Sequence, residues 1–534
     1  MLLQLGSIFF LLHSIHAIQV PNRINWRKER GGLPDTWSNA QKQQHIKSSF
    51  QFAWEGYKNY SWGYDENRPV TNAWQNTRNG WGASIVDGLD TLYIMDLMDE
   101  FDEARQFVKE IDWDQANEEV QVFETVIRYV GGLLAAYDLS GDEMFVAKSV
   151  ELVDRLMPAF DTPTGIPFQY MNFSTGEPVY NHVACLAEVG TLQIEFTRLS
   201  EITGNWTYHY RGQHVYDSFN NMQIKSFGLL PHLIDVRTGD PIGNYITWGG
   251  MADSFYEYLI KQLVTSKGQD LVKRDMVSQV IAGLESELLD PSPIDDTAAF
   301  LANRVGGRKI RNMDELACFA PGSLLLAARN FPELMNVEET AKKLMKGCYS
   351  AWDSTNTGLA PEIFGWIGPD EVDEPKEPEK GAVAKAFIYF QDREGTMLNR
   401  KYNEDKMKKK KQQRPLYPVH PTYILRPETV ESLYYFYVYT HDKIYQDMAW
   451  DIYNSLYTYC KANSGFSGLR HVDNIDKLWD DRQESFFFAE TLKYLYLIFD
   501  NPNNPRFPLD KWVFNTEAHP LLITDIIPPA EKVK

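Results

Sequence analysis

The sequence has few of the residues, and none of the motifs, that many common catalytic sites require. It contains 11 histidines and four cysteines in 534 residues. It has no H-E-x-x-H, G-x-S-x-G, P-loop or G-x-G-x-x-G pattern, which argues against zinc peptidases, serine hydrolases, P-loop nucleotidases and dinucleotide-binding enzymes. The absence of C-x-x-C spacing argues against a zinc or thioredoxin-like site. In an oxidising compartment one or two disulfides are expected, with three pairings open to Cys185, Cys318, Cys348 and Cys460.

Positive charge is also scarce. The chain has 53 Lys and Arg residues against 73 Asp and Glu residues, a net charge of −20. Such a field repels polyanions, so no nucleic-acid partner is expected. The one basic run, Lys406 with Lys408–Lys411, lies in a polar stretch over residues 392–418. We predict that this run forms a solvated loop.

The N-terminal apolar stretch, residues 2–17, is short of the ~20 residues that span a bilayer. Residues 1–17 are therefore predicted to be a cleaved signal peptide, with a signal anchor as the alternative. Membrane association is expected only if this segment stays uncleaved. N-x-[ST] sequons at Asn59, Asn172 and Asn205 agree with a secretory route, and the tail is not of the K-D-E-L type. The expected localisation is the lumen of the endoplasmic reticulum or Golgi, or secretion.

Strand signals are few, and apolar residues at helical spacing fill most of the chain. The helices are punctuated by turns at Gly141, Gly204, Gly268 and Asn330, which are 62 to 64 residues apart, and after an insert by His441. A period of this length accommodates two helices, so the pattern predicts stacked helical hairpins. About seven hairpins fit between residues 40 and 520. We therefore predict an all-α fold, one catalytic (αα)₇ barrel over 40–520, with an open helical array as the alternative.

Five acids occupy one phase of this repeat, each 13 to 17 residues before a turn: Glu124, Glu188, Asp253, Glu315 and Glu428. If the hairpins close into a ring, the starts of the inner helices share a rim, and these acids converge on one pocket. Helix capping is the alternative explanation, because acids favour first helical turns.

Capping does not account for further charged residues placed one turn deeper. Glu124 precedes Arg128 by four residues, Asp253 precedes Glu257 by four, and Glu428 precedes Glu431 by three, so each pair shares a helix face. Burying carboxylates is costly unless they are paired, protonated or bound to a cation. Two chemistries use several carboxylates in one pocket: glycoside hydrolysis and the binding of a hard cation such as Ca²⁺.

Several strings resemble the class I α-1,2-mannosidases, family 47 of the glycoside hydrolases. The resemblance runs in order from about Gln43 to Pro520. The matching strings are Asn79–Thr91, Phe123–Arg128 with Gly131–Leu134, Ala187–Glu188 with Glu195–Phe196, Asp253–Leu259, Leu425–Ser432, Glu484–Phe487 with Ala489–Leu495, and Asn515–Pro520. The resemblance implies an (αα)₇ barrel that removes terminal α-1,2-linked mannose from high-mannose N-glycans of glycoproteins, with inversion and one Ca²⁺.

The resemblance also implies roles for individual residues. Glu124 and Asp253 match two catalytic acids, Glu124 acting through a water, and the resemblance leaves open which of them donates the proton. Glu428 matches the base that activates water. Thr516 matches the Ca²⁺ ligand. Arg128 is expected to hold the charge state of Glu124, and Arg426 and Phe486 to contact the sugar, Phe486 by stacking. The expected acidic lining is Asp87, Glu188, Glu257, Glu431, Glu490 and Glu517. Cys318 and Cys348 match the family's disulfide.

Two departures from the family pattern bear on function. Glu315 stands where the family usually has a pocket histidine, and an added acid is expected to raise neighbouring pKa values or shift the pH optimum. Met251 stands where the endoplasmic reticulum enzymes carry an arginine that limits them to one mannose, so broader trimming is expected. Two alternatives remain open: a mannosidase-like lectin of glycoprotein quality control with little or no turnover, and a different α/α-barrel hydrolase or sugar epimerase.

Overall fold

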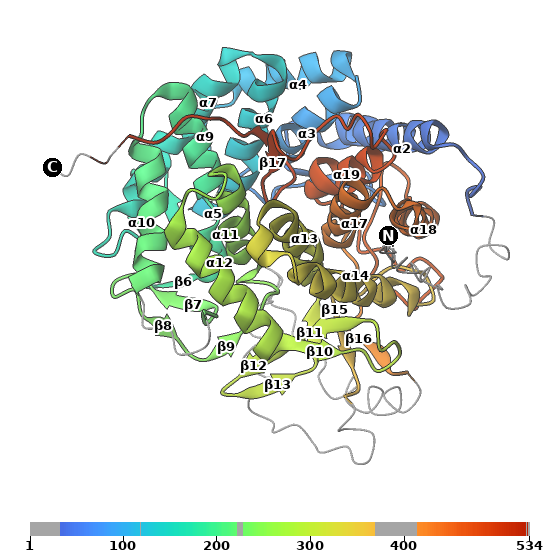
Figure 1. The fold of residues 1–534 in the computed structure, drawn as a ribbon. Coiled ribbons are helices and arrows are strands. Elements are labelled where there is room, and N and C mark those ends of the chain that lie inside the picture. Colours follow the sequence, from blue (N-terminus) through green and yellow to red (C-terminus); the bar gives the residue numbers. More distant parts are fainter. Residues whose placement is uncertain (1–31, 118, 222–227, 369–413, 530, 532–534) are drawn as a thin grey trace, which may run out of the picture. The chain divides into compact units, whose positions relative to one another are not determined.

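The computed structural model describes residues 32–117, 119–221, 228–368, 414–529 and 531 (Figure 1). The chain divides into two compact units, Met1–Asp35 and Thr36–Lys534, and every helix and strand of the described residues belongs to the second unit. The predicted signal segment 1–17 and the basic run from Lys406 to Lys411 lie outside the described residues. Within the described part of the chain, no helix has both the length and the apolar character needed to cross a bilayer.

Helices dominate the second unit, and consecutive helices pack in pairs (Figure 1). The pairs are α3 (Ala83–Ile94) with α4 (Met98–Glu110), α6 (Gly131–Ser140) with α7 (Glu143–Leu156), α9 (Gln193–Thr203) with α10 (Thr207–Asn221), α11 (Asp253–Thr265) with α12 (Leu271–Gly283), α13 (Ala320–Asn330) with α14 (Val337–Asp353), and α17 (Glu428–Thr440) with α18 (Lys443–Tyr459). The long helix α2 (Asn39–Ser61) packs against α19 (Leu492–Leu497). The predicted helical hairpins are therefore confirmed.

The predicted turns join the two helices of each pair. Gly141, Gly204 and His441 adopt the left-handed conformation, with φ of 74°, 73° and 57°, and each closes its helix by a backbone hydrogen bond. Asn330 also ends its helix, α13, as predicted, but not in the left-handed conformation. There the chain leaves α13 through the extended residue Phe331, and the Asn330 side chain donates to the Leu326 carbonyl at 2.8 Å. The Phe331 amide donates to the Ala327 carbonyl, so the last turn of α13 is closed by backbone and side-chain hydrogen bonds together.

The first helix of each pair is more deeply buried than the second. In α11 every residue from Ser254 to Val264 is buried, whereas α4 buries only Phe101, Ala104 and Val108. The buried helices contact one another in succession: α3 with α6, α6 with α9, α9 with α11, α11 with α13, α13 with α17, and α17 with α19. The π-helical turn Phe487–Thr491, which leads into α19, contacts α3.

Short antiparallel sheets connect the helix pairs, a feature that the prediction of an all-α chain missed. The described residues form seven sheets of two or three strands. Their strands are β1 (Glu66–Arg68) and β2 (Ala73–Gln75); β3 (Val120–Gln121), β4 (Tyr170–Asn172) and β5 (Glu177–Val179); β6 (Val183–Cys185), β7 (Leu233–Asp235) and β8 (Pro241–Ile242); β9 (Tyr245–Ile246), β12 (Asn303–Val305) and β13 (Arg308–Ile310); β10 (Leu289–Pro291) and β11 (Ala299–Leu301); β14 (Asn312–Asp314), β15 (Ile363–Trp366) and β16 (Leu416–His420); β17 (Trp512–Phe514) and β18 (Pro520–Leu522). Strands of two to five residues are too short to show a clear period of two in the sequence.

One disulfide forms among the four cysteines. Cys318 is bonded to Cys348, with their Cα atoms 5.8 Å apart, as the family resemblance implies. The bond ties the segment that begins at Glu315 to α14. Cys185 and Cys460 are buried free thiols, so the option of a second disulfide is not realised.

Candidate active site

The five acids that share one phase of the repeat all lie at or near the start of a helical segment. Asp253 and Glu428 begin α11 and α17, and Glu315 begins the 3₁₀ helix Glu315–Phe319. Glu124 ends the short helix α5 (Val122–Glu124), where it leads into the π-helical turn Thr125–Val130. Glu188 departs from the expectation: it lies in a separate short helix, α8 (Leu186–Gly190), and not in α9. Short strands precede these segments and deliver the acids to the ends of the buried helices.

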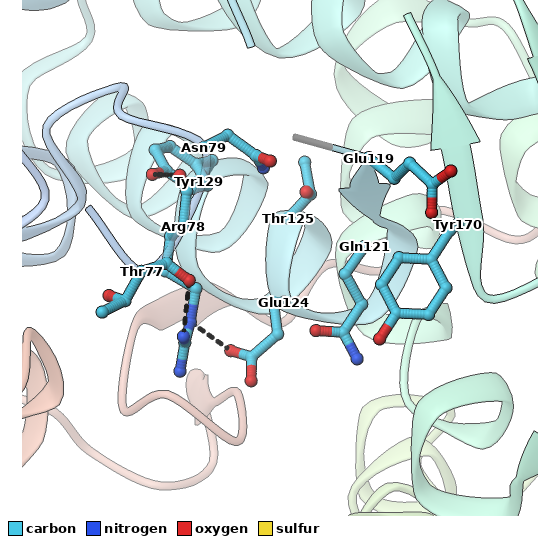
Figure 2. A pocket seen from close by; sticks show the side chains of 9 residues that line it. All are labelled: Thr77, Arg78, Asn79, Glu119, Gln121, Glu124, Thr125, Tyr129 and Tyr170. Carbon is cyan, nitrogen blue, oxygen red and sulfur yellow. Dashed lines mark hydrogen bonds and ion pairs between the residues drawn. The ribbon is translucent and has the colours of Figure 1, made fainter. Parts of the chain in front are cut away.

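Glu124 and Arg78 line a small pocket and pair with each other (Figure 2), and Arg128 holds the same carboxyl. Its Oε2 accepts hydrogen bonds from Arg128 Nε at 2.7 Å and from Arg78 Nε at 3.2 Å. Burial of the carboxyl opposes ionisation, but the charges of Arg128 and Arg78 lower the pKa of Glu124 to about 2. Glu124 is therefore a carboxylate across the neutral pH range, and it has no proton of its own to donate.

Arg128 is the centre of a buried ionic cluster. Besides Glu124 it pairs with Glu517, and its Nη1 lies 3.4 Å from Asp87 Oδ2 and 3.3 Å from Ser485 Oγ. Asp87 continues the network inward, since its Oδ1 lies 3.4 Å from His519 Nε2. Behind these groups, His519 and Lys493 both contact Asp90. The contacts with Glu517, Asp87 and Ser485 hold the Arg128 side chain in place, and Arg128 in turn holds Glu124.

Asp253 has the opposite electrostatic environment. Its Oδ1 accepts a hydrogen bond from the Ser254 amide at 2.8 Å, but no arginine or lysine pairs with it among the described ion pairs. Burial, together with the negative charge of Glu428, raises the pKa of Asp253 to about 7. Near neutral pH this carboxyl holds a proton for a large fraction of the time. The preceding Met251 lies in the left-handed region at φ 74°, and its carbonyl accepts from the Ala187 amide at 2.9 Å.

Glu428 lies beside Arg426 and Phe486. Arg426 Nη1 is 3.8 Å from Glu428 Oε1, and its Nε donates to Glu362 Oε2 at 2.8 Å. The Phe486 ring lies between two guanidinium groups, 5.7 Å from that of Arg426 and 5.8 Å from that of Arg128. Burial and the neighbouring charge of Glu315 raise the pKa of Glu428 well above its ordinary value, against the effect of Arg426. Phe486 thus lies close both to Arg426, which is beside Glu428, and to Arg128, which holds Glu124.

Thr516 lies among the remaining carboxylates. Its Oγ1 donates to Glu257 Oε2 at 2.7 Å, and Glu257 also pairs with Lys261, whose Nζ is 3.5 Å from Glu431 Oε1. Burial raises the pKa values of Glu431 and Glu517 to about 8 and that of Glu490 well above its usual range. The carboxylates outnumber the cations here, which suits a site for a hard cation. In the described part of the chain no three His, Cys, Asp or Glu side chains are arranged to hold a metal ion by themselves.

Glu188 lies on the side of the cluster nearest Glu124. Its carboxylate accepts hydrogen bonds from Gln121 Nε2 at 2.6 Å and from Gln169. Burial raises its pKa, and the negative charge of Glu124 adds to that effect. The buried thiol of Cys185 hydrogen bonds to Glu188. Polar rather than cationic partners thus surround this acid.

Several polar residues of the cluster were not predicted from the sequence, among them Arg78, Ser485, Lys261 and Glu362. Arg78 directly precedes the string Asn79–Thr91, so an extension of that string by one residue would have found it. Ser485 already lies inside the string Glu484–Phe487, but no role was assigned to it. Lys261 lies one helical turn after Glu257 on α11, which the spacing rule would have flagged. Glu362 carries no sequence signal, because it meets Arg426 across 64 residues of chain.

An acidic cluster that combines a carboxyl of raised pKa with further carboxylates, close to an aromatic ring, is characteristic of a glycoside hydrolase. Comparison with known proteins identifies the family. The sequence model of glycosyl hydrolase family 47 matches residues 49–523, and the chain belongs to this family.

Individual relatives of the chain support the same family membership. The chain is 36% identical over 515 residues to mannosyl-oligosaccharide 1,2-alpha-mannosidase IB of Homo sapiens, covering 94% of this chain and 73% of that protein. It is 38% identical over 500 residues to mannosyl-oligosaccharide 1,2-alpha-mannosidase MNS1 of Arabidopsis thaliana, covering 92% and 80%. The solved structure of alpha-1,2-mannosidase from Trichoderma reesei superposes with a TM-score of 0.81 at 29% identity, covering 91% of this chain and 100% of that one. The family resemblance and the prediction of a glycoside hydrolase are confirmed.

Proposed function

We propose that this protein is an inverting α-1,2-mannosidase that removes terminal α-1,2-linked mannose from high-mannose N-glycans in the secretory pathway. Its membership of family 47 and the names of its relatives support the substrate. One observation of the site carries the chemistry: Asp253, with a pKa of about 7, interacts electrostatically with Glu428 across the ends of two different helices.

We further propose that the helical pairs close into an (αα)₇ barrel. The unbroken succession of contacts from α3 through α6, α9, α11, α13 and α17 to α19, with the turn before α19 against α3, supports closure. Such a ring places the N-terminal ends of the buried helices, and so the acids, at one rim.

In this mechanism Asp253 donates its proton to the leaving glycosidic oxygen, and Glu428 takes a proton from the attacking water. An inverting enzyme keeps these two carboxyl groups roughly 6.5–9.5 Å apart, with room for that water. Glu124 stays ionised between Arg128 and Arg78 and stabilises positive charge that develops on the sugar ring. Phe486 stacks on the apolar face of the sugar. Arg426 and the carboxylates bind its hydroxyl groups; these carboxylates are Asp87, Glu188, Glu257, Glu431, Glu490 and Glu517.

A calcium ion fits the oxygen-rich surroundings of Thr516. The Thr516 hydroxyl and carbonyl would hold the ion, and Glu257 and the nearby acids would hold its water molecules. The surplus of buried carboxylates with raised pKa values is the observation that favours a cation here. When bound, the ion would orient the sugar and polarise water. The residues of this chain hold the ion, bind the sugar and move the protons.

The proposal is tested by mass spectrometry of a high-mannose N-glycan incubated with the purified protein, with and without a calcium chelator. We expect stepwise loss of hexoses, no loss with the chelator, and recovery when calcium is restored. The variant Glu428→Gln serves as the inactive control, with a rate at least about 100-fold lower. A glycan that binds and stays intact would contradict the hydrolase and favour the lectin alternative. Trimming that persists in the chelator would contradict the role assigned to Thr516.

A further inference from the structure

Two carboxyl groups meet at the start of α17: Glu315 is 1% exposed, and the Glu428 side chain is 13% exposed. The Glu315 carboxyl lies within hydrogen-bonding reach of that of Glu428. No N–H or O–H group of the described residues donates to Oε2 of either carboxyl. A hydrogen bond between two carboxyl groups requires a proton on one of them. A single shared proton therefore accounts for the contact and for both oxygens that lack a donor.

The surrounding hydrogen bonds fix how Glu315 faces its partner. The Trp352 indole N–H donates to Thr429 Oγ1 at 3.0 Å, so the Thr429 hydroxyl proton is directed onward to Glu315 Oε1, at 2.7 Å. The Thr429 amide also donates to Oε1, at 3.2 Å. These bonds commit Oε1 of Glu315 and leave Oε2 for Glu428.

The segment that carries Glu315 is also locked to α17. Ser432 Oγ donates to the Cys318 carbonyl at 2.5 Å and accepts from the Gly322 amide at 2.9 Å. The Glu315 amide donates to the Glu362 carbonyl at 2.9 Å. The contact between the two carboxyls is thus built by the fold and does not depend on a mobile side chain.

The charges around Glu428 make full ionisation of this pair unfavourable. Arg426 is the only cation that faces it among the described ion pairs, and Arg426 is shared with Glu362. The other titratable groups of the described residues that face Glu428 are the acids Glu315, Asp253, Glu431 and Glu490 and the phenol of Tyr423. Like charges confined together keep a proton between them, as in two-carboxylate sites generally.

We propose that Glu315 and Glu428 act together as one general base that carries a single shared proton in the resting enzyme. This inference rests on the proposed hydrolase function. An O–H bond of the attacking water breaks, and its proton passes to the oxygen of Glu428 that faces the water, so that the pair then holds two protons. The water oxygen bonds to the anomeric carbon while the glycosidic C–O bond breaks, and the leaving oxygen takes the proton of Asp253. Release of one proton from the pair and reprotonation of Asp253 complete the cycle.

The pH dependence of kcat/KM on an α-1,2-linked mannoside separates this role from a structural one. Glu315→Gln keeps an N–H donor for ionised Glu428, so its activity should stay within about 10-fold of wild type. Glu315→Leu removes the donor. We expect an activity loss of about 100-fold and an acid limb that moves at least about one pH unit upward, because buried Glu428 then ionises with more difficulty. Glu195→Gln, which alters a buried acid paired with Tyr258 and Asn515, should leave the acid limb in place.

A downward move of the acid limb in Glu315→Leu would overturn the proposal, since it would mean that Glu315 is an ionised neighbour. An unmoved acid limb would overturn it too, by assigning Glu315 a structural role only.

Infrared difference spectra at neutral pH test the shared proton without turnover, so a failure of proton sharing can be told apart from a failure of the hydrolase proposal. Wild type minus Glu315→Gln and wild type minus Glu428→Gln should each show one protonated carboxyl band lost. Retention of that band in either variant would contradict proton sharing.

Discussion

Replacing Asp253 by asparagine is expected to abolish turnover and, at the same time, to stabilise the protein at alkaline pH. Asparagine cannot donate the proton that the leaving oxygen needs, so kcat should fall by about 10³- to 10⁴-fold. The effect on stability follows from the raised pKa. Folded Asp253 titrates at about 7, whereas an unfolded aspartate titrates near about 4.

The sign of this stability change is set by where the proton is held. Below about pH 4 Asp253 is protonated in both the folded and the unfolded protein, so its ionisation does not change the free energy of unfolding. As pH rises from about 4 to 7 the unfolded chain loses the proton first, so the wild type becomes progressively less stable. At pH 8 the Asn variant should therefore unfold with a free energy about 2 kcal/mol higher than the wild type, a value reduced for partial solvent access. At pH 4 the two should be equal.

Denaturant unfolding of both proteins at pH 4 and pH 8, alongside steady-state kinetics, provides the measurement. Asp525→Asn is the matched control, because the Asp525 side chain is 91% exposed. It should change neither activity nor the pH dependence of stability. A gain that is equal at both pH values, or retained activity in Asp253→Asn, would contradict the assignment of Asp253 as the proton donor.

Arg128→Met is expected to be the most destabilising change in the site. Removal of the guanidinium leaves Glu124, Asp87 and Glu517 without their shared buried cation. Breaking a buried ion pair from one side typically costs about 3–5 kcal/mol, and we expect about 4 kcal/mol at pH 7. The pKa of Glu124, held at about 2 in the wild type, should rise in the variant. The stabilisation from Glu124 ionisation is fully present above its unfolded pKa of about 4 and is lost as pH falls toward about 2, so the difference between the two proteins should shrink over that range.

Urea unfolding at pH 7 and at about pH 3 tests this expectation. Arg155→Met is the control: it also removes an arginine from an ion pair, but Arg155 and its partner Asp114 are 35% and 54% exposed. Its cost should be under about 1 kcal/mol. If Arg128→Met cost no more than this control, the buried cluster would not be the structural anchor of Glu124.

The parts of the fold that depend on local sequence could be predicted. Gly141, Gly204 and His441 end their helices because each residue tolerates the left-handed conformation. These helix ends depend only on residues within one turn of the chain. Asn330 also ends its helix, but not in the left-handed conformation, and its side chain donates a hydrogen bond to the Leu326 carbonyl. The break between α8 and α9 was also missed, because Thr191 and Leu192 carry no helix-breaking signal.

The positions of the acids along the helices could be predicted from the sequence, but their protonation states could not. The repeat placed Glu124, Asp253 and Glu428 at equivalent helix ends, which is a property of spacing alone. Their opposite protonation states depend on partners from elsewhere in the chain. Arg78 reaches Glu124 across 46 residues, and Thr429 reaches Glu315 across 114. Spacing does not encode these contacts, so the sequence could not distinguish an acid held as a carboxylate from one that keeps a proton.

The stereochemistry of the released sugar distinguishes direct attack by water from a covalent route. Proton NMR of an α-1,2-linked mannobioside, recorded in the first minutes after addition of enzyme and calcium, reports the anomer formed before mutarotation. A water activated by Glu428, on the face of the ring opposite the leaving oxygen protonated by Asp253, predicts β-mannose as the first product. Initial formation of α-mannose would contradict the roles of both residues, because it would require a covalent intermediate in place of direct attack by water.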